Sequence, residues 1–205
     1  QRHVRSVVPA LPSIIVNCAD VLPRCDETYQ FVPVRFDGYA SLTDTGAHLQ
    51  LWLYNLPQDE ETYGVGVDTS DGIGQDASTI EGLRKGTPER AHAQTCEFAS
   101  SYIKADQLWP MSLALAVYHS VWQSKTQRRQ QCRVAVECMG NGEIVQDEMK
   151  KRGWYNFHPW KRLDNRVRIK NKDVHKEGIW TNVWFRAMMM DRLLTAIDEE
   201  MLDVW

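Results

Sequence analysis

Residues 63–68 read Tyr-Gly-Val-Gly-Val-Asp, and the loop that follows at 69–76 reads Thr-Ser-Asp-Gly-Ile-Gly-Gln-Asp. The alternating valines predict a half-buried strand that ends on Asp68, and the polar glycine-containing loop predicts a turn. Two further β-branched or apolar runs at 77–83 and 93–102 are each bounded by turn residues. Three successive strands of this kind predict an antiparallel meander.

Beyond the meander, the sequence pattern alternates between helices and strands. We expect a helix over 106–122, a buried strand over 132–138, a short amphipathic helix over 143–151, a strand over 156–163 and a final helix that begins at Thr181 or Asn182 and ends at Glu200. A meander followed by alternating helices and strands predicts an α/β fold, a ribonuclease H-like mixed β-sheet with flanking helices.

The segments before this central pattern and the end of the chain have weaker or different signals. Residues 31–36 and 48–54 are predicted strands, whereas residues 1–30 hold three prolines and no sustained period, which predicts a linker ahead of one domain at 31–205. The final helix is expected to pack through one apolar face, formed by Phe185, Met188, Met189, Leu193, Ala196 and Ile197. The basic stretch 161–176 is predicted to be a loop.

The charge of the chain is unevenly distributed. The 205 residues carry 27 acidic and 24 basic side chains, a net charge of −3. Residues 125–176, however, contain 14 lysines and arginines against six acids. Such a cluster is typical of phosphate contacts with nucleic acid. The residues that we expect to contact DNA are Arg128, Arg129, Lys161, Arg162, Arg166 and Arg168.

Two carboxylates end the two most apolar strands, Asp68 after the first and Glu137 after the fourth. If these strands are neighbours, the two carboxylates lie side by side, and their mutual repulsion favours a cation between them. Hard oxygen ligands suit Mg²⁺ or Mn²⁺, and a pair of such ions supports phosphodiester hydrolysis. We therefore expect metal ligands at Asp68, Glu137 and Asp76. Asp71 is either a further ligand or a solvated turn residue.

Other chemistries lack their sequence signatures. The five cysteines form no C-x-x-C pair and are expected to be reduced and buried. The chain contains no P-loop and no G-x-S-x-G nucleophile elbow. Its longest uncharged apolar run is too short for a membrane-spanning helix, so we expect no membrane partner.

Several of these stretches resemble the nuclease domain of tailed-bacteriophage terminase large subunits. The resemblance covers roughly residues 30–200, and it is carried by 63–68, by the loop ending Gln-Asp-Ala-Ser at 75–78, by Val-Ala-Val-Glu at 134–137 before Asn141 and Gly142, by Asn-Phe-His at 156–158 and by Gly-Ile-Trp-Thr-Asn at 178–182. It implies a metal-dependent endonuclease that cuts concatemeric double-stranded DNA during packaging, in the cytoplasm of the infected bacterium. An ATPase domain, a portal and a small terminase subunit are the implied partners.

The resemblance also assigns roles to residues. Asp68 and Glu137 match two acidic metal ligands, and Asp76 matches an auxiliary acid. The family has a further aspartate after the last helix, often in an Asp-Asp pair, which this sequence lacks. Three alternatives are therefore open for the third metal ligand: Asp191, Asp198 or a residue beyond Trp205.

Two further expectations concern the extent and the activity of the chain. The start at Gln1 predicts a fragment of a longer protein. The alternatives are another ribonuclease H-like nuclease, of the resolvase or transposase type, and a non-catalytic module that docks DNA or a portal.

Overall fold

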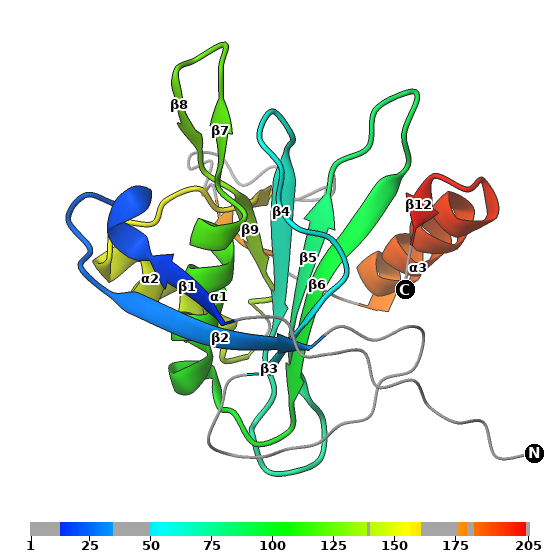
Figure 1. Ribbon diagram of the computed structural model, residues 1–205. Coiled ribbons are helices and arrows are strands. Elements are labelled where there is room, and N and C mark those ends of the chain that lie inside the picture. The colour runs from blue at the N-terminus through cyan, green and yellow to red at the C-terminus, as the bar shows by residue number, and fades with distance from the viewer. Residues whose placement is uncertain (1–12, 35–49, 139, 161–175, 180–182, 204–205) are drawn as a thin grey trace, which may run out of the picture.

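The computed structural model describes residues 13–34, 50–138, 140–160, 176–179 and 183–203 (Figure 1). Within them, seven strands of the main sheet follow the order β1-β2-β3-β6-β5-β4-β9, and an eighth, β12, pairs with β6. The bounds are β1 (Ile14–Asn17), β2 (Thr28–Val34), β3 (Gln50–Leu53), β4 (Tyr63–Asp68), β5 (Ser78–Arg84), β6 (His92–Ser100), β9 (Arg133–Val136) and β12 (Leu202–Asp203).

The remaining described elements are three helices, a 3-10 helix and two small two-stranded sheets. Their bounds are α1 (Ala105–Tyr118), α2 (Gly142–Lys151), α3 (Val183–Asp198), η1 (Cys18–Asp20), β7 (Val121–Gln123) with β8 (Arg128–Gln130), and β10 (Pro159–Trp160) with β11 (Lys176–Glu177). None of the described helices has both the length and the apolar character needed to cross a membrane.

The centre of the sheet has the predicted ribonuclease H-like order. Strands β4, β5 and β6 form an antiparallel meander, and β9 pairs parallel to β4. On the other side of β9, Glu137 forms a parallel bridge with Ile179. In this arrangement, the first strand of a three-strand meander pairs with a parallel fourth strand. It confirms the predicted fold class, a ribonuclease H-like mixed β-sheet.

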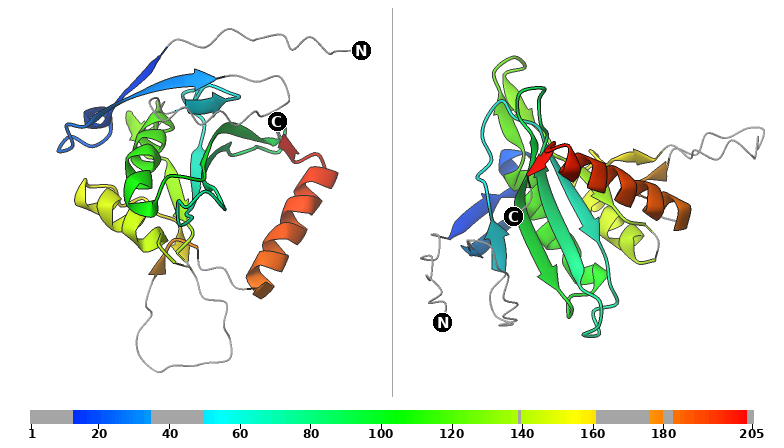
Figure 2. Two further views of the ribbon diagram at one scale, coloured as in Figure 1. Left: turned by 90° about the horizontal axis from the view of Figure 1, so that it is seen from below. Right: turned by 90° about the vertical axis from the view of Figure 1, so that its right-hand side faces the viewer.

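Helices α1 and α2 cover one face of the sheet, and α3 lies on the other side (Figure 2, left). The consecutive residues from Met111 to Val117 in α1 are all buried, so this part of the helix is enclosed on every side. The valines of β4 and β9 point toward the same layer and are almost fully buried. The hydrophobic core therefore lies between the sheet and α1, and all five cysteines are buried as thiols.

The opposite face of the sheet is built from small and polar residues. On this face, β4 and β9 carry the half-buried Gly64, Gly66 and Ala135 and the exposed Asp68 and Arg133. Helix α3 extends away from the sheet (Figure 2). Its predicted apolar face is not buried, because Met189, Leu193 and Ile197 are each 40% exposed. The burial expected for this helix is therefore wrong for these three side chains.

The described part of residues 1–30 differs from the predicted linker. Strand β1 pairs antiparallel with β2, and Val16, Cys18 and Leu22 are buried in the core. Pro23 lies in a turn after η1, and β1 and η1 are only four and three residues long, too short for a period to appear in the sequence.

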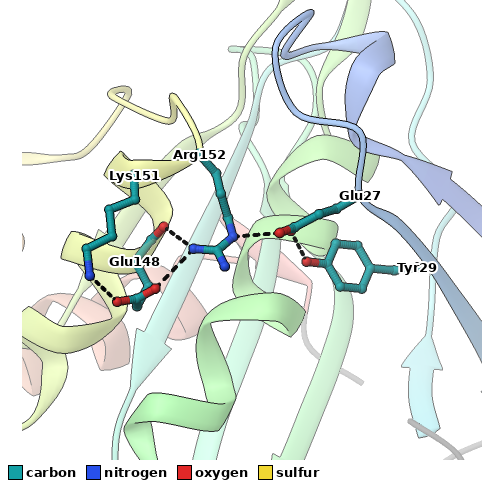
Figure 3. Close-up of polar contacts among 5 residues, drawn as sticks. All are labelled: Glu27, Tyr29, Glu148, Lys151 and Arg152. Carbon is teal, nitrogen blue, oxygen red and sulfur yellow. Dashed lines mark hydrogen bonds and ion pairs between the residues drawn. The ribbon is translucent and has the colours of Figure 1, made fainter.

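An ion-pair network attaches this N-terminal hairpin to the helical layer (Figure 3). Arg152 donates through Nε to Glu27 at 2.8 Å and through Nη1 to Glu148 at 3.0 Å, while Tyr29 donates its hydroxyl to Glu27. The guanidinium of Arg152 also stacks 3.4 Å from the ring centroid of Trp109. Stacked and ion-paired at once, Arg152 connects α1, α2 and the segment before β2.

The helix predicted over 106–122 ends earlier than expected, at Tyr118. The hydroxyl of Ser120 donates back to the carbonyl of Ala116 at 2.7 Å, and His119 is within 2.8 Å of the carbonyl of Leu115. These side chains satisfy the last carbonyls of the helix, so the chain leaves it and forms the β7–β8 hairpin.

Candidate active site

The structure brings together the two carboxylates that end β4 and β9. Val67 and Val136 are partners in the parallel ladder, and the amide of Glu137 donates to the carbonyl of Val67 at 2.8 Å. Asp68 and Glu137 therefore follow paired residues on adjacent strands. Both lie on the sheet face opposite α1, because they alternate with buried valines.

The two carboxyl groups are electrostatically coupled. Partial desolvation at the strand end raises the pKa of Asp68, and the negative charge of Glu137 raises it further. A hydrogen bond between the two carboxyl groups acts in the same direction. The backbone amide of Thr69 and the positive charge of Arg186 oppose these effects. The pair is thus a site where a positive charge is favoured.

Close backbone packing fixes the position of Glu137. A Cβ atom on Gly142, the first residue of α2, would lie 1.9 Å from the carbonyl oxygen of Glu137. On the other side, the amide of Cys138 donates to the carbonyl of Ile179 at 2.7 Å. Gly178, with φ of +90°, leaves no room for a side chain beside the thiol of Cys138. Only glycine fits at these two positions, so the strand end is held from both sides.

Loop 69–77 forms the wall of a cavity of about 370 Å³ in front of the two carboxylates. The loop begins at a hydrogen-bonded corner, where the amide of Ser70 donates to Ser78 Oγ at 2.9 Å and Ser78 Oγ donates to the carbonyl of Ile103 at 3.0 Å. Thr69 is among the residues that line this cavity, whereas its hydroxyl is buried without a hydrogen-bond partner among the described residues. No local sequence pattern marks this residue, because threonine after a strand is common.

The other predicted acids lie farther from the pair. Asp71 and Asp76 line the same cavity but are exposed, and Asp71 accepts a hydrogen bond from Asn141 at 3.4 Å. Among the described residues, no three His, Cys, Asp or Glu side chains are close enough to hold a metal together. Asp191 and Asp198 are exposed on α3 and do not line the cavity. The ligand roles of these four residues stay predictions.

Arg186 enters the cavity from the first turns of α3, and the sequence analysis missed it. Its Nη2 atom lies 3.4 Å from Oε1 of Glu137. The bridge between Glu137 and Ile179 brings the start of α3 to this edge of the sheet. A local pattern could not reveal this contact, since it joins residues 49 positions apart.

The predicted DNA-contacting residues fall in two groups. Arg128 and Arg129 lie on β8, whose partner β7 contacts the segment before β4: the amide of Trp122 donates to Asp59 at 3.0 Å. They are therefore at the start of β4, roughly 20 Å from the end that carries Asp68. Lys161, Arg162, Arg166 and Arg168 lie outside the described residues. DNA contact by either group stays a prediction.

Comparisons with known proteins find a structural likeness but no match by sequence. No protein-family model matches the chain, and no curated protein matches it. Among solved structures, the chain is similar to the large terminase nuclease from thermophilic phage G20c, solved with bound magnesium, at 12% sequence identity and a TM-score of 0.49. The match covers 75% of this chain and 63% of the phage chain.

Proposed function

We propose that this chain is a metal-dependent endonuclease domain that hydrolyses phosphodiester bonds of double-stranded DNA. The observation that carries the proposal is the coupled pair of Asp68 and Glu137 at the ends of two parallel strands, facing an open cavity. Ligands of open α/β sheets commonly bind beyond the carboxyl ends of parallel strands. The cavity is open enough to admit a backbone phosphate.

The residues of this cavity fit a divalent cation. Asp68 and Glu137 offer carboxylate oxygens within hydrogen-bond reach of each other, a costly arrangement unless a cation neutralises it. Asp71 and Asp76 add further carboxylate oxygens to the lining of the cavity. An all-oxygen donor set suits Mg²⁺ or Mn²⁺ over softer metals. Asp68 and Glu137 would hold the ion, with Asp76 as an auxiliary acid from the loop.

The protein's own groups prepare this site for chemistry. A bound pair of divalent cations supplies Lewis-acid activation of the phosphodiester. The amide of Thr69 orients the carboxylate of Asp68, and the ladder hydrogen bond from Glu137 to Val67 fixes the second carboxylate. Because both acids extend from strand ends, their spacing is set before substrate arrives, which is the preorganisation that catalysis requires.

We further propose that the domain acts in a viral DNA-packaging terminase, where an ATPase domain, a portal and a small terminase subunit are its partners. The motifs at 63–68, 75–78, 134–137 and 178–182 support this context. The strand order β6-β5-β4-β9 is compatible with it.

The test is cleavage of supercoiled plasmid in Mn²⁺ and in EDTA. We expect nicking and linearisation that need Mn²⁺ and that fall by at least about 10³-fold in the Asp68→Asn, Glu137→Gln double variant, because both charged ligands are removed. The exposed α2 acid Asp147 supplies a control, Asp147→Asn, which removes a carboxylate away from the cavity and should cut normally. Unchanged cutting in the double variant contradicts the site. Duplex binding by the native chain without any Mn²⁺-dependent cutting favours the non-catalytic docking module.

A further inference from the structure

Arg186 is the one lysine or arginine among the described residues that line the cavity. All the other charged side chains lining it are acids: Asp68, Asp71, Asp76 and Glu137. An arginine that faces four carboxylates in a proposed phosphodiester site calls for a physical explanation. Arg186 can be a permanent ion-pair partner of Glu137, or it can bind a ligand that enters the cavity later.

The contact with Glu137 has the geometry of a temporary one. Nη2 of Arg186 reaches one carboxylate oxygen at 3.4 Å, whereas strong arginine–carboxylate pairs are bidentate and near 2.7–2.9 Å. The Arg186 side chain is 69% exposed, whereas that of Glu137 is 15% exposed. Water therefore competes for the guanidinium at the arginine end of this pair, whereas the carboxylate end is largely buried. Arg186 can leave Glu137 when another positive charge takes its place beside the carboxylates.

The chemistry of the guanidinium identifies what it would contact next. A carboxylate that coordinates a divalent cation loses most of its attraction for a nearby arginine, since its charge is already neutralised. Phosphate matches the planar fork of arginine donors and is bound bidentately by it. We propose that Arg186 pairs with Glu137 in the metal-free site and transfers to a phosphate of the DNA backbone once the carboxylates hold divalent cations. This inference rests on the function proposed above.

The first test measures Mn²⁺ binding without DNA, by titration calorimetry. The Arg186→Ala variant should bind Mn²⁺ about three- to tenfold more tightly than the native chain, because a positive charge that competes for Glu137 is removed. Arg192 lies six residues along the same helix, is exposed and does not line the cavity, so Arg192→Ala is the matched control and should bind as the native chain does. Equal Mn²⁺ affinity in the two variants overturns the competition for Glu137.

The second test measures the binding of a short DNA duplex in the presence of Ca²⁺, which takes the place of Mn²⁺ at the carboxylates. This test measures binding alone and not cleavage. Arg186→Ala should bind the duplex about five- to twentyfold more weakly and reduce the slope of log K against log salt by about 1. Arg186→Lys should recover part of the affinity, because it keeps the charge without the bidentate fork. Unchanged duplex affinity in Arg186→Ala, relative to Arg192→Ala, overturns the proposal even if Mn²⁺ binds more tightly.

The two proposals fail in distinguishable ways. If the native chain neither binds Mn²⁺ nor cuts plasmid, the proposed function is wrong. If the native chain does both, and Arg186→Ala matches Arg192→Ala in both assays, only the role of Arg186 is wrong. The KM for DNA distinguishes a phosphate contact from a purely structural role of Arg186. Loss of a phosphate contact in Arg186→Ala raises the KM, whereas loss of a purely structural role leaves the KM unchanged.

Discussion

Acids reach the cavity from two kinds of structure, strand ends and a loop. Asp68 and Glu137 follow residues that are paired in the β4–β9 ladder, so the sheet determines where their carboxylates lie. Asp71 and Asp76 are exposed in loop 69–77 and share the cavity without joining the pair. The comparison indicates that the site has a rigid part, which sets the geometry, and an adjustable part, which can adapt to a ligand.

Disturbing the rigid part should have the largest effect. In Gly142→Ala, the new methyl group would lie 1.9 Å from the carbonyl oxygen of Glu137, so the strand end or the start of α2 must shift. We expect the free energy of unfolding to fall by about 3 kcal/mol. We also expect a strong loss of Mn²⁺-dependent cleavage, since Glu137 moves with its backbone. Urea unfolding and the plasmid assay measure the two effects.

Gly66→Ala is the control for this change. It lies on β4, and its new methyl group would be 4.0 Å from the nearest atom, the carbonyl oxygen of Glu81. A glycine-to-alanine change without a clash reduces the freedom of the unfolded chain, so stability should stay equal or rise by up to about 1 kcal/mol. If both variants lose the same stability, packing against Glu137 is not what makes Gly142 necessary.

Changing the adjustable part should have a smaller effect. Asp76→Asn removes one exposed carboxylate from the cavity without touching the ladder. We expect Mn²⁺ affinity and cleavage to fall by about tenfold or less, as for a residue that supports a metal site from outside its direct ligands. Calorimetric titration with Mn²⁺ decides the matter. A loss as complete as that of Asp68→Asn would place Asp76 among the direct ligands.

The smallest expected effect is a gain in stability. Without metal, desolvation and the charge of Glu137 raise the pKa of Asp68, so its ionised form destabilises the fold at neutral pH. Asp68→Asn removes that charge. Because the side chain reaches solvent, screening limits the gain to about 0.5–1 kcal/mol, or roughly 2 °C in Tm. Thermal unfolding in EDTA at pH 7 measures it.

The same variant has a defined pH dependence. A raised pKa in the folded protein means that Asp68 keeps its proton to a higher pH in the folded state than in the unfolded chain. The stability that this proton contributes is complete below the pKa of the unfolded chain and is lost as the pH rises through the pKa of the folded protein. The advantage of Asp68→Asn should therefore shrink as pH falls from 7 toward 4. The difference in Tm is the quantity to follow, because burial raises the pKa of Glu81 to about 7 and this group titrates in both proteins. A constant difference across this range contradicts the coupling.

The sequence was sufficient for the centre of the sheet and for the two strand-end acids. Alternating valines mark β4, and a run of buried-type residues marks β9, so the residue that ends each strand is visible in the local pattern. Their proximity follows from the fold class, because the fourth strand pairs with the first. Local periodicity and one topological rule together locate the pair.

Features that depend on distant contacts could not be predicted in this way. The four-residue strand β1 is too short to show a period, and it exists because β2 pairs with it. The apolar positions of α3 predicted burial, but periodicity describes a helix surface and not what lies against it. Arg186 reaches Glu137 because Ile179 pairs beside β9, a contact that no local pattern encodes.

The junction at Arg152 has a consequence for how the chain folds during synthesis. Its partner Glu27 lies 125 residues earlier, whereas Asp68 and Thr79 of the meander pair across loop 69–77. At about 5–20 residues per second, the ribosome would add Arg152 roughly 6–25 s after Glu27. We expect the hairpin of β1 and β2, although made first, to wait for α2 and to dock after the meander has formed. The earliest-made part of the described chain would thus be among the last to acquire its native contacts.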